Sequence, residues 1–130
     1  MEAEQQLFAA NGVRTDLEMA SFFADHGDPT RALALARAAY RERPSVLGAD
    51  TLAWALYRAG HSAEAAPYLA KALHLGTQSS RILYHAGMIE IALGDTDSAR
   101  DHLRQALGLN PAFSPLDAPR AAAALAGLAQ

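Results

Sequence analysis

Three glycines divide this chain at nearly equal intervals. Gly27, Gly60 and Gly94 lie 33 and 34 residues apart, and an alanine follows each of them five and twelve residues later. These alanines are Ala32, Ala65 and Ala99, and then Ala39, Ala72 and Ala106. A period of this length indicates similar units that stack on their neighbours to bury a shared core.

The segment 49–75 shows what one unit looks like. Apolar residues recur at helical spacing on both sides of Gly60, which predicts two antiparallel helices joined at this glycine. Glycine readily adopts the left-handed conformation in which a helix ends. Ser62 is expected to cap the second helix, with Glu64 in its first turn.

Composition supports an all-α fold. About half of the 130 residues are hydrophobic, and β-branched residues never alternate over the length of a strand. A chain of this length buries roughly two-thirds of its unfolded surface, enough for one domain. The absence of cysteine excludes disulfides and thiolate zinc sites.

Capping residues, glycines and prolines set the expected organisation. A short N-terminal helix is expected within 1–12, stopped by Asn11 and Gly12. Three hairpins and a capping helix are then expected as repeats 13–45, 46–79 and 80–113 and a final segment 114–130. The expected N-caps are Asp28, Ser79 or Ser80, Asp95 or Thr96, and Asp117.

The period and the small residues resemble the tetratricopeptide repeat family. The best copies read TLAWALYRAGHSAEAAPYLAKAL and ILYHAGMIEIALGDTDSARDHLRQALGLNP, whereas DLEMASFFADHGDPTRALALARAAYRERP is more degenerate. The family's leucine-glycine position is Ala86-Gly87 in the third copy, and its early tryptophan is missing from all three. The resemblance implies an all-α, right-handed superhelical solenoid of three hairpins.

The family also implies a function, which is non-catalytic binding of a peptide or protein in a concave groove lined by the first helix of each repeat. In this register the groove residues are Asp50, Trp54, Tyr57, Arg58, Arg81, Tyr84, His85, Met88 and Ile91. Aromatic residues and methionine beside arginine are typical of binding hot spots. The alternative is that Trp54 and Tyr84 are core residues, or are covered by the N-terminal helix or a second copy of the chain.

Charge narrows the range of partners. The net charge of −3 leaves no basic footprint for nucleic acid. Arg31, Arg37, Arg41 and Arg43 form a local basic face, interpreted as a solvated surface, with a weak, salt-sensitive anionic contact as the alternative. Leu17 and Ser21 stand where some family members carry a lysine and an asparagine that bind a carboxylate, so that mode of binding is not expected.

Catalytic and cofactor chemistry find no support. No two of the five histidines have the i, i+4 spacing of a helical zinc site, and no phosphate-binding loop or catalytic constellation is present. No apolar run approaches the roughly 20 residues that span a bilayer, and a cytoplasmic location is favoured. The alternative function is a structural or self-associating segment of a larger multidomain protein, including a homodimer.

Overall fold

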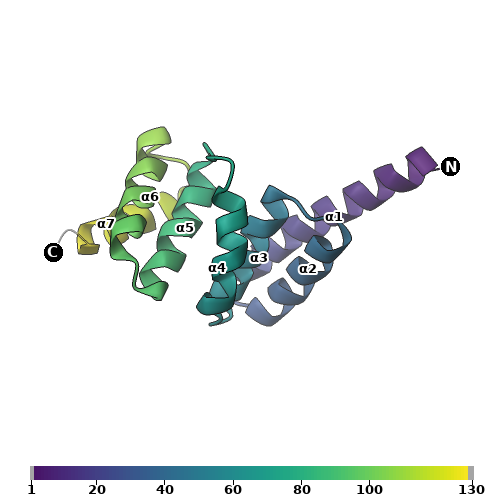
Figure 1. The fold of residues 1–130 in the computed structure, drawn as a ribbon, viewed down its shortest axis with the longest axis horizontal. Coiled ribbons are helices and arrows are strands. Elements are labelled where there is room, and N and C mark those ends of the chain that lie inside the picture. The colour runs from purple at the N-terminus through teal and green to yellow at the C-terminus, as the bar shows by residue number, and fades with distance from the viewer. Residues whose placement is uncertain (1, 129–130) are drawn as a thin grey trace. The chain divides into compact units, whose positions relative to one another are not determined.

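The computed structural model describes the backbone of residues 2–128 and the side chains of residues 12–128. Seven helices and no strand occur over this range (Figure 1). They are α1 (Glu2–Asp25), α2 (Pro29–Glu42), α3 (Val46–Arg58), α4 (Ser62–Leu73), α5 (Ser80–Leu93), α6 (Thr96–Leu109) and α7 (Asp117–Leu128). The prediction of an all-α chain is confirmed.

The first helix is the main departure from the sequence prediction. The break expected at Asn11 and Gly12 is wrong, because α1 continues through both residues. A glycine inside a helix costs only about 1 kcal/mol relative to alanine. The buried residues Val13 and Leu17 follow within the same helix and pack with Ala39 of α2, which offsets that cost.

Three of the five predicted caps precede a helix as expected. Asp28 and Asp95 accept hydrogen bonds from the backbone N–H groups of Arg31 and Ser98, and Ser79 accepts one from Ile82. Two predicted caps are displaced, because α4 begins at Ser62 and α7 at Asp117, which are therefore first helical residues. Ser45, where the sequence predicts the α3 helix to begin, is a further cap, and its Oγ accepts from Gly48 N–H at 2.9 Å.

The three hairpin glycines share one backbone arrangement. Gly27, Gly60 and Gly94 have φ of 90°, 86° and 83°. In each case the N–H of the next residue donates to the carbonyl oxygen five residues before it, in the pairs Asp28–Phe23, His61–Leu56 and Asp95–Glu90. This bond satisfies a carbonyl left open at the helix end, so the sequence repeat is also a repeat in backbone structure.

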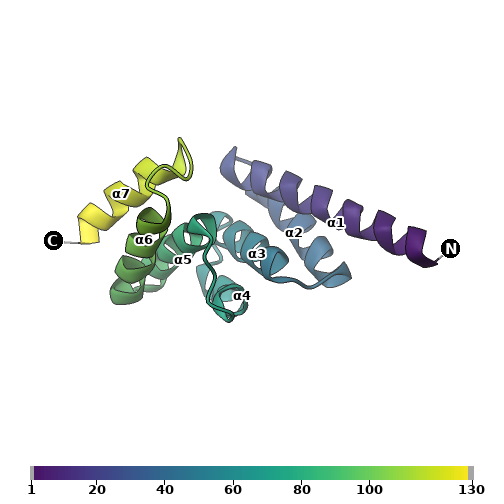
Figure 2. The ribbon, with the colours of Figure 1, turned by 90° about the horizontal axis from the view of Figure 1, so that it is seen from above.

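The chain folds into two compact units, Met1–Lys71 and Ala72–Gln130. In the first unit α1 and α2 run side by side, and both contact α3 (Figures 1 and 2). Alanines fill the places where these helices approach closely, including Ala20, Ala32, Ala36 and Ala53, all fully buried. The assignment of the whole chain to a single domain stays a prediction.

In the second unit α5 and α6 form an antiparallel pair, visible side by side in Figure 1. Gly87 of α5 lies against Leu103 of α6 so closely that a Cβ on the glycine would stand 2.6 Å from Leu103 Cγ. Where α5 begins, the Ser80 hydroxyl donates to the Ala106 carbonyl oxygen of α6 at 2.8 Å.

The last helix packs on this pair. α7 contacts both α5 and α6, with Ala118 and Ala121 buried. The Ser114 hydroxyl oxygen accepts from the N–H of Asp117 at 3.0 Å, and Arg100 Nη2 donates to the Leu128 carbonyl oxygen at 2.9 Å. Both ends of α7 are therefore held by polar side chains.

None of the helices within the described residues combines the length and the apolar character that crossing a membrane requires.

Candidate functional site

On α5, three side chains with accessible surface form a stripe, and Ala92 and Leu93 at the end of the helix are exposed as well. Arg81 is exposed, and Met88 and Ile91 are half-buried, whereas the residues between 82 and 87 are buried. Arg81 and Met88 are seven residues apart, so they lie on the same side of the helix. Two apolar side chains beside an arginine match the composition of a binding hot spot.

The other two α5 residues predicted for the groove, Tyr84 and His85, are only 2% and 1% exposed. The Tyr84 ring lies 5.8 Å from the ring of Phe113, a residue between α6 and α7. These two side chains therefore belong to the core and offer almost no surface to a partner.

The α3 residues predicted for the groove hold the end of α1. Trp54 is 4% exposed, and its Nε1–H donates to Asp25 Oδ1 at 2.9 Å. Arg58 is exposed, and its Nε donates to the Ala24 carbonyl oxygen at 3.0 Å. Trp54 is therefore buried, as in the alternative of a core residue, and its partner Asp25 lies in the part of α1 that was assigned to the first repeat.

Tyr57 is half-buried, its ring 5.0 Å from the Trp54 ring, whereas Asp50 is buried. Of the nine predicted groove residues, five thus keep accessible surface: Tyr57, Arg58, Arg81, Met88 and Ile91. That these residues contact a partner stays a prediction.

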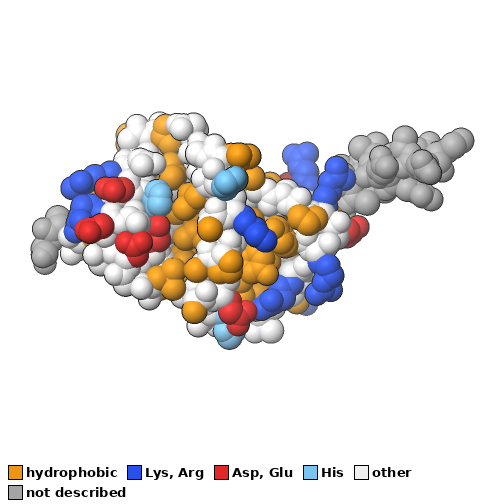
Figure 3. Space-filling model, in the orientation of Figure 1, with side chains coloured by type: hydrophobic (Ala, Val, Ile, Leu, Met, Phe, Trp, Pro, Cys, Tyr) orange, Lys and Arg blue, Asp and Glu red, His pale blue; other side chains and the backbone are white. Residues whose placement is uncertain are grey.

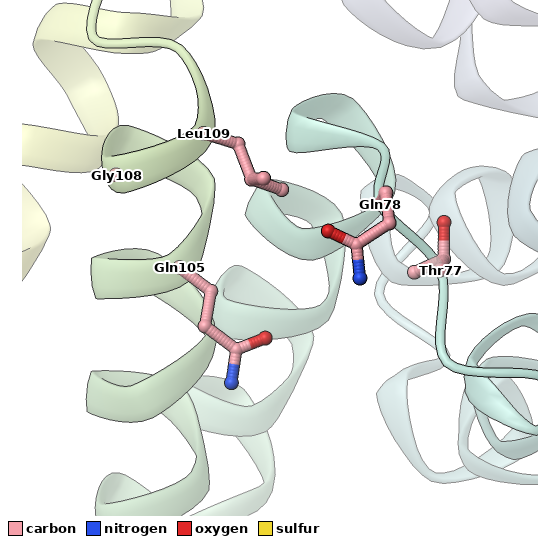
Figure 4. Close-up of a pocket in the computed structure, with 5 residues that line it drawn as sticks. All are labelled: Thr77, Gln78, Gln105, Gly108 and Leu109. Carbon is pink, nitrogen blue, oxygen red and sulfur yellow. The ribbon is translucent and has the colours of Figure 1, made fainter.

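A pocket of about 360 Å³ with polar and apolar lining lies within the second unit (Figure 4). The side chains of Gln78 and Gln105 project toward it, and Thr77, Gly108 and Leu109 complete its lining. Primary amides both donate and accept hydrogen bonds, as a peptide backbone requires of its partner. No residue of this pocket was predicted as a site, because isolated glutamines carry no sequence signal.

A second pocket of about 370 Å³ lies between the end of α6 and α7. Its lining is mostly apolar, with Leu107, Pro111, Pro115, Ala118 and Ala122 among its residues. Such a lining suits an aliphatic side chain and offers no group for acid–base chemistry.

One ionisable pair crosses from α5 to α6. His102 Nδ1 lies 2.6 Å from Glu90 Oε1, and both side chains are largely buried. The hydrogen bond to Glu90 raises the pKa of His102 above its ordinary 6.5, and burial opposes this effect. The sequence analysis excluded a helical zinc site from the histidine spacing and predicted no partner for His102. The spacing of the two residues from the hairpin glycine could have predicted this pair. Glu90 lies four residues before Gly94 and His102 eight residues after it, on the two helices that the turn brings together.

Metal chemistry has no candidate centre here, since the described residues contain no cluster of three His, Cys, Asp or Glu side chains suited to a metal ion.

Comparison with known families gives one match. Residues 51–114 fit the family model described as tetratricopeptide repeat. This range covers the α3–α4 and α5–α6 hairpins almost completely. No curated protein sequence matches the chain.

Solved structures extend the similarity over nearly the whole chain. The P58(IPK) TPR domain is 24% identical, with a TM-score of 0.69 over 90% of this chain and 32% of that one. The chain therefore spans about a third of this relative's length.

Two further structures contain a peptide. The first TPR of Spaghetti (RPAP3), bound to the HSP90 peptide SRMEEVD, is 17% identical, with a TM-score of 0.70 over 92% of this chain and 95% of that one. The Yersinia enterocolitica type III secretion chaperone SycD, in complex with a peptide of the translocator YopD, is 15% identical, with a TM-score of 0.68 over 92% and 93%. These similarities confirm the predicted fold, an all-α solenoid of helical hairpins.

Proposed function

Since the chain belongs to the tetratricopeptide repeat family, we propose that it is a non-catalytic scaffold that binds a peptide or protein partner. Two proteins of the same fold hold peptides, one from HSP90 and one from YopD. At 17% and 15% identity these ligands do not transfer to this chain, but they support the general class of function.

The observation that carries the proposal is the stripe on α5. Arg81, Met88 and Ile91 keep accessible surface, whereas the residues between them are buried, and only Ala92 and Leu93 at the end of α5 are exposed as well. Tyr57 and Arg58 of α3, also predicted for the groove, are proposed as further contacts. A partner with an apolar side chain next to a carboxylate would satisfy both the methionine and the arginine.

Arg81→Glu tests this proposal in an affinity pull-down from the source organism's lysate. Arg81 is exposed, so reversing its charge leaves the core intact. The expected result is that a protein retained by the wild type is lost or strongly reduced with this variant. Isothermal titration with the purified partner then measures the loss of affinity.

Arg104→Glu is the matched control, because Arg104 is also exposed but lies on α6. It changes the net charge equally and should retain the partner. Equal retention by all three proteins would contradict the proposed face. Trp54→Ala and Tyr84→Ala are less suitable tests, because both side chains are buried and their loss would destabilise the fold.

Self-association is the second candidate, and one observation favours it. Met19 and Phe22 on α1 are 43% and 56% exposed, three residues apart on the same side of the helix. Light scattering over a range of concentrations would show a dimer that Phe22→Gln dissociates. A mass that stays monomeric at every concentration would contradict this role.

A further inference from the structure

A third pocket, in the first unit, plays no part in the proposed function. It lies between α2 and α4, has a volume of about 250 Å³, and is lined by Arg37, Tyr40, Arg41, Leu52 and Tyr68. Such a volume is large enough to admit a small polar group. We name it the tyrosine pocket.

The two tyrosines are held in place by their surroundings. Their rings meet edge to face with centroids 5.4 Å apart. Tyr40 also packs against the first turn of α3, where a Cβ on Gly48 would stand 3.3 Å from its ring. Both tyrosines are half-buried, so the pocket wall is preformed and still accessible.

Positive charge surrounds this wall. Arg37 and Arg41 stand one helical turn apart on α2, and Lys71 Nζ lies 5.6 Å from the centroids of both tyrosine rings. Figure 3 shows blue basic side chains around orange hydrophobic ones on the face formed by α2 and α4. Arg37 is already paired with Glu64 at 3.2 Å.

Arg41 and Lys71, in contrast, form no ion pair within the part of the chain that the structure describes, and both are exposed. Two arginines thus line the pocket, one of them paired with Glu64, and Lys71 lies beside its tyrosine rings, which leaves an excess of positive charge nearby. This excess suits a phosphate monoester, which carries a charge of about −1.5 to −2 at neutral pH.

Hydrogen-bond donors point to the same ligand. Guanidinium, ammonium and phenol groups all donate, and a phosphate offers three acceptor oxygens where a carboxylate offers two. Arginine in particular binds phosphate through two parallel N–H groups. We propose that the tyrosine pocket binds a phosphorylated side chain of a partner peptide, as a second binding site independent of the α5 stripe.

The test is a ¹H–¹⁵N NMR titration of the full chain at pH 7.5 and low salt, where the phosphate is doubly charged and screening is weak. The probes are the peptide Gly-Ala-phosphoserine-Ala-Gly, its serine form, its glutamate form, and inorganic phosphate. The phosphopeptide is expected to shift the amide resonances of Tyr40, Arg41 and Tyr68 in a saturable way. The serine form should leave them unchanged.

Arg41→Gln is expected to weaken phosphopeptide binding at least about tenfold, the loss typical of one hydrogen bond to a charged group. Tyr68→Phe removes one hydroxyl donor and keeps the ring, so it should weaken binding less. Arg104→Gln removes the same charge from α6 and should bind like the wild type.

Several results would overturn the proposal. These are equal binding of the serine or glutamate peptide, binding of inorganic phosphate without the phosphopeptide, equal binding by Arg41→Gln and Arg104→Gln, and no saturable shift. Because these probes and variants leave Arg81 intact, such a failure would not bear on the α5 stripe. Conversely, loss of a partner with Arg81→Glu would not bear on this pocket.

Discussion

At the scale of single residues, one close contact between α5 and α6 depends on a missing side chain. A Cβ on Gly87 would lie 2.6 and 2.7 Å from two Leu103 atoms and 3.3 Å from the Ala99 carbonyl oxygen. Leu103 is fully buried and has little room to move aside. The glycine of the family's Leu-Gly position is therefore a spacing requirement.

Gly87→Ala is expected to lower the free energy of unfolding by about 1–3 kcal/mol, because the added methyl overpacks a filled core. Urea denaturation followed by circular dichroism measures the change. Gly108→Ala is the control, because a Cβ on this α6 glycine meets nothing within 4 Å. It should be neutral or stabilise by up to about 1 kcal/mol through helix propensity. Equal effects of the two changes would contradict the close contact.

A second single-residue effect concerns the His102–Glu90 pair and depends on pH. The hydrogen bond to Glu90 raises the pKa of His102 in the folded chain above 6.5, so folding favours the protonated imidazole. The stabilisation is complete below about pH 6.5 and is lost as the pH rises through the raised pKa.

His102→Gln should therefore destabilise the chain more at pH 5.5 than at pH 8. A difference on the order of 1 kcal/mol is expected for a hydrogen bond to a charged group in a partly buried position. Urea titrations of both proteins at the two pH values measure it, and the other four histidines cancel in the comparison. The same destabilisation at both values would show that the charged pair does not form.

At the scale of elements, α7 is secured at its first turn by a serine outside the helix. The Ser114 hydroxyl oxygen accepts from the N–H groups of Leu116 and Asp117 at 3.3 and 3.0 Å. Ser114→Ala should cost about 1 kcal/mol, the typical loss of a helix cap. In this variant, amide hydrogen exchange should increase more in α7 than in α5 and α6. Ser114→Asp keeps an acceptor and should restore protection, and its failure to do so would contradict the capping role.

The junction of α1 with α3 makes a prediction about the single tryptophan. Because Trp54 is buried and donates to Asp25, its fluorescence emission should be blue-shifted and poorly quenched by acrylamide. Trp54→Phe, which keeps an aromatic ring but loses the donor, should destabilise the chain by roughly 1–3 kcal/mol. A red-shifted, easily quenched emission would instead support an open groove at this residue.

The hairpin turns were the most predictable part of this fold, because they depend on local chemistry. The repeated glycines and caps such as Asp28 and Asp95 act on their own backbone neighbours. Asn11 and Gly12 misled the prediction because a local stop signal yields to the packing of Val13 and Leu17 on α2.

The surroundings of the candidate site residues were less predictable. Alanine-rich helices show apolar residues on several sides, so periodicity does not tell which aromatic residue is covered. Trp54 is covered because Asp25 provides a hydrogen-bond acceptor for its indole N–H, 29 residues earlier in the chain. The tyrosine pocket combines side chains from α2, α3 and α4 and has no motif of its own.

At the scale of the whole molecule, the chain comprises two compact units. In repeat proteins stability is approximately the sum of the units and of their nearest-neighbour interactions. Gly87→Ala should therefore speed amide hydrogen exchange in α5 and α6 more than in α1 and α2. Mass-spectrometric exchange at a low urea concentration measures both, and an equal increase in every helix would indicate fully cooperative unfolding.

The recurring backbone arrangement at Gly60 and Gly94 makes this chain suited to construction by duplication. The segment 61–94 starts just after one left-handed glycine and ends on another, and the same five-residue hydrogen bond closes both turns. If a second copy of 61–94 were inserted after Gly94, its first residue would follow a left-handed glycine, just as His61 follows Gly60 in the present chain. The array could thus be lengthened by gene duplication or by design without a new linker.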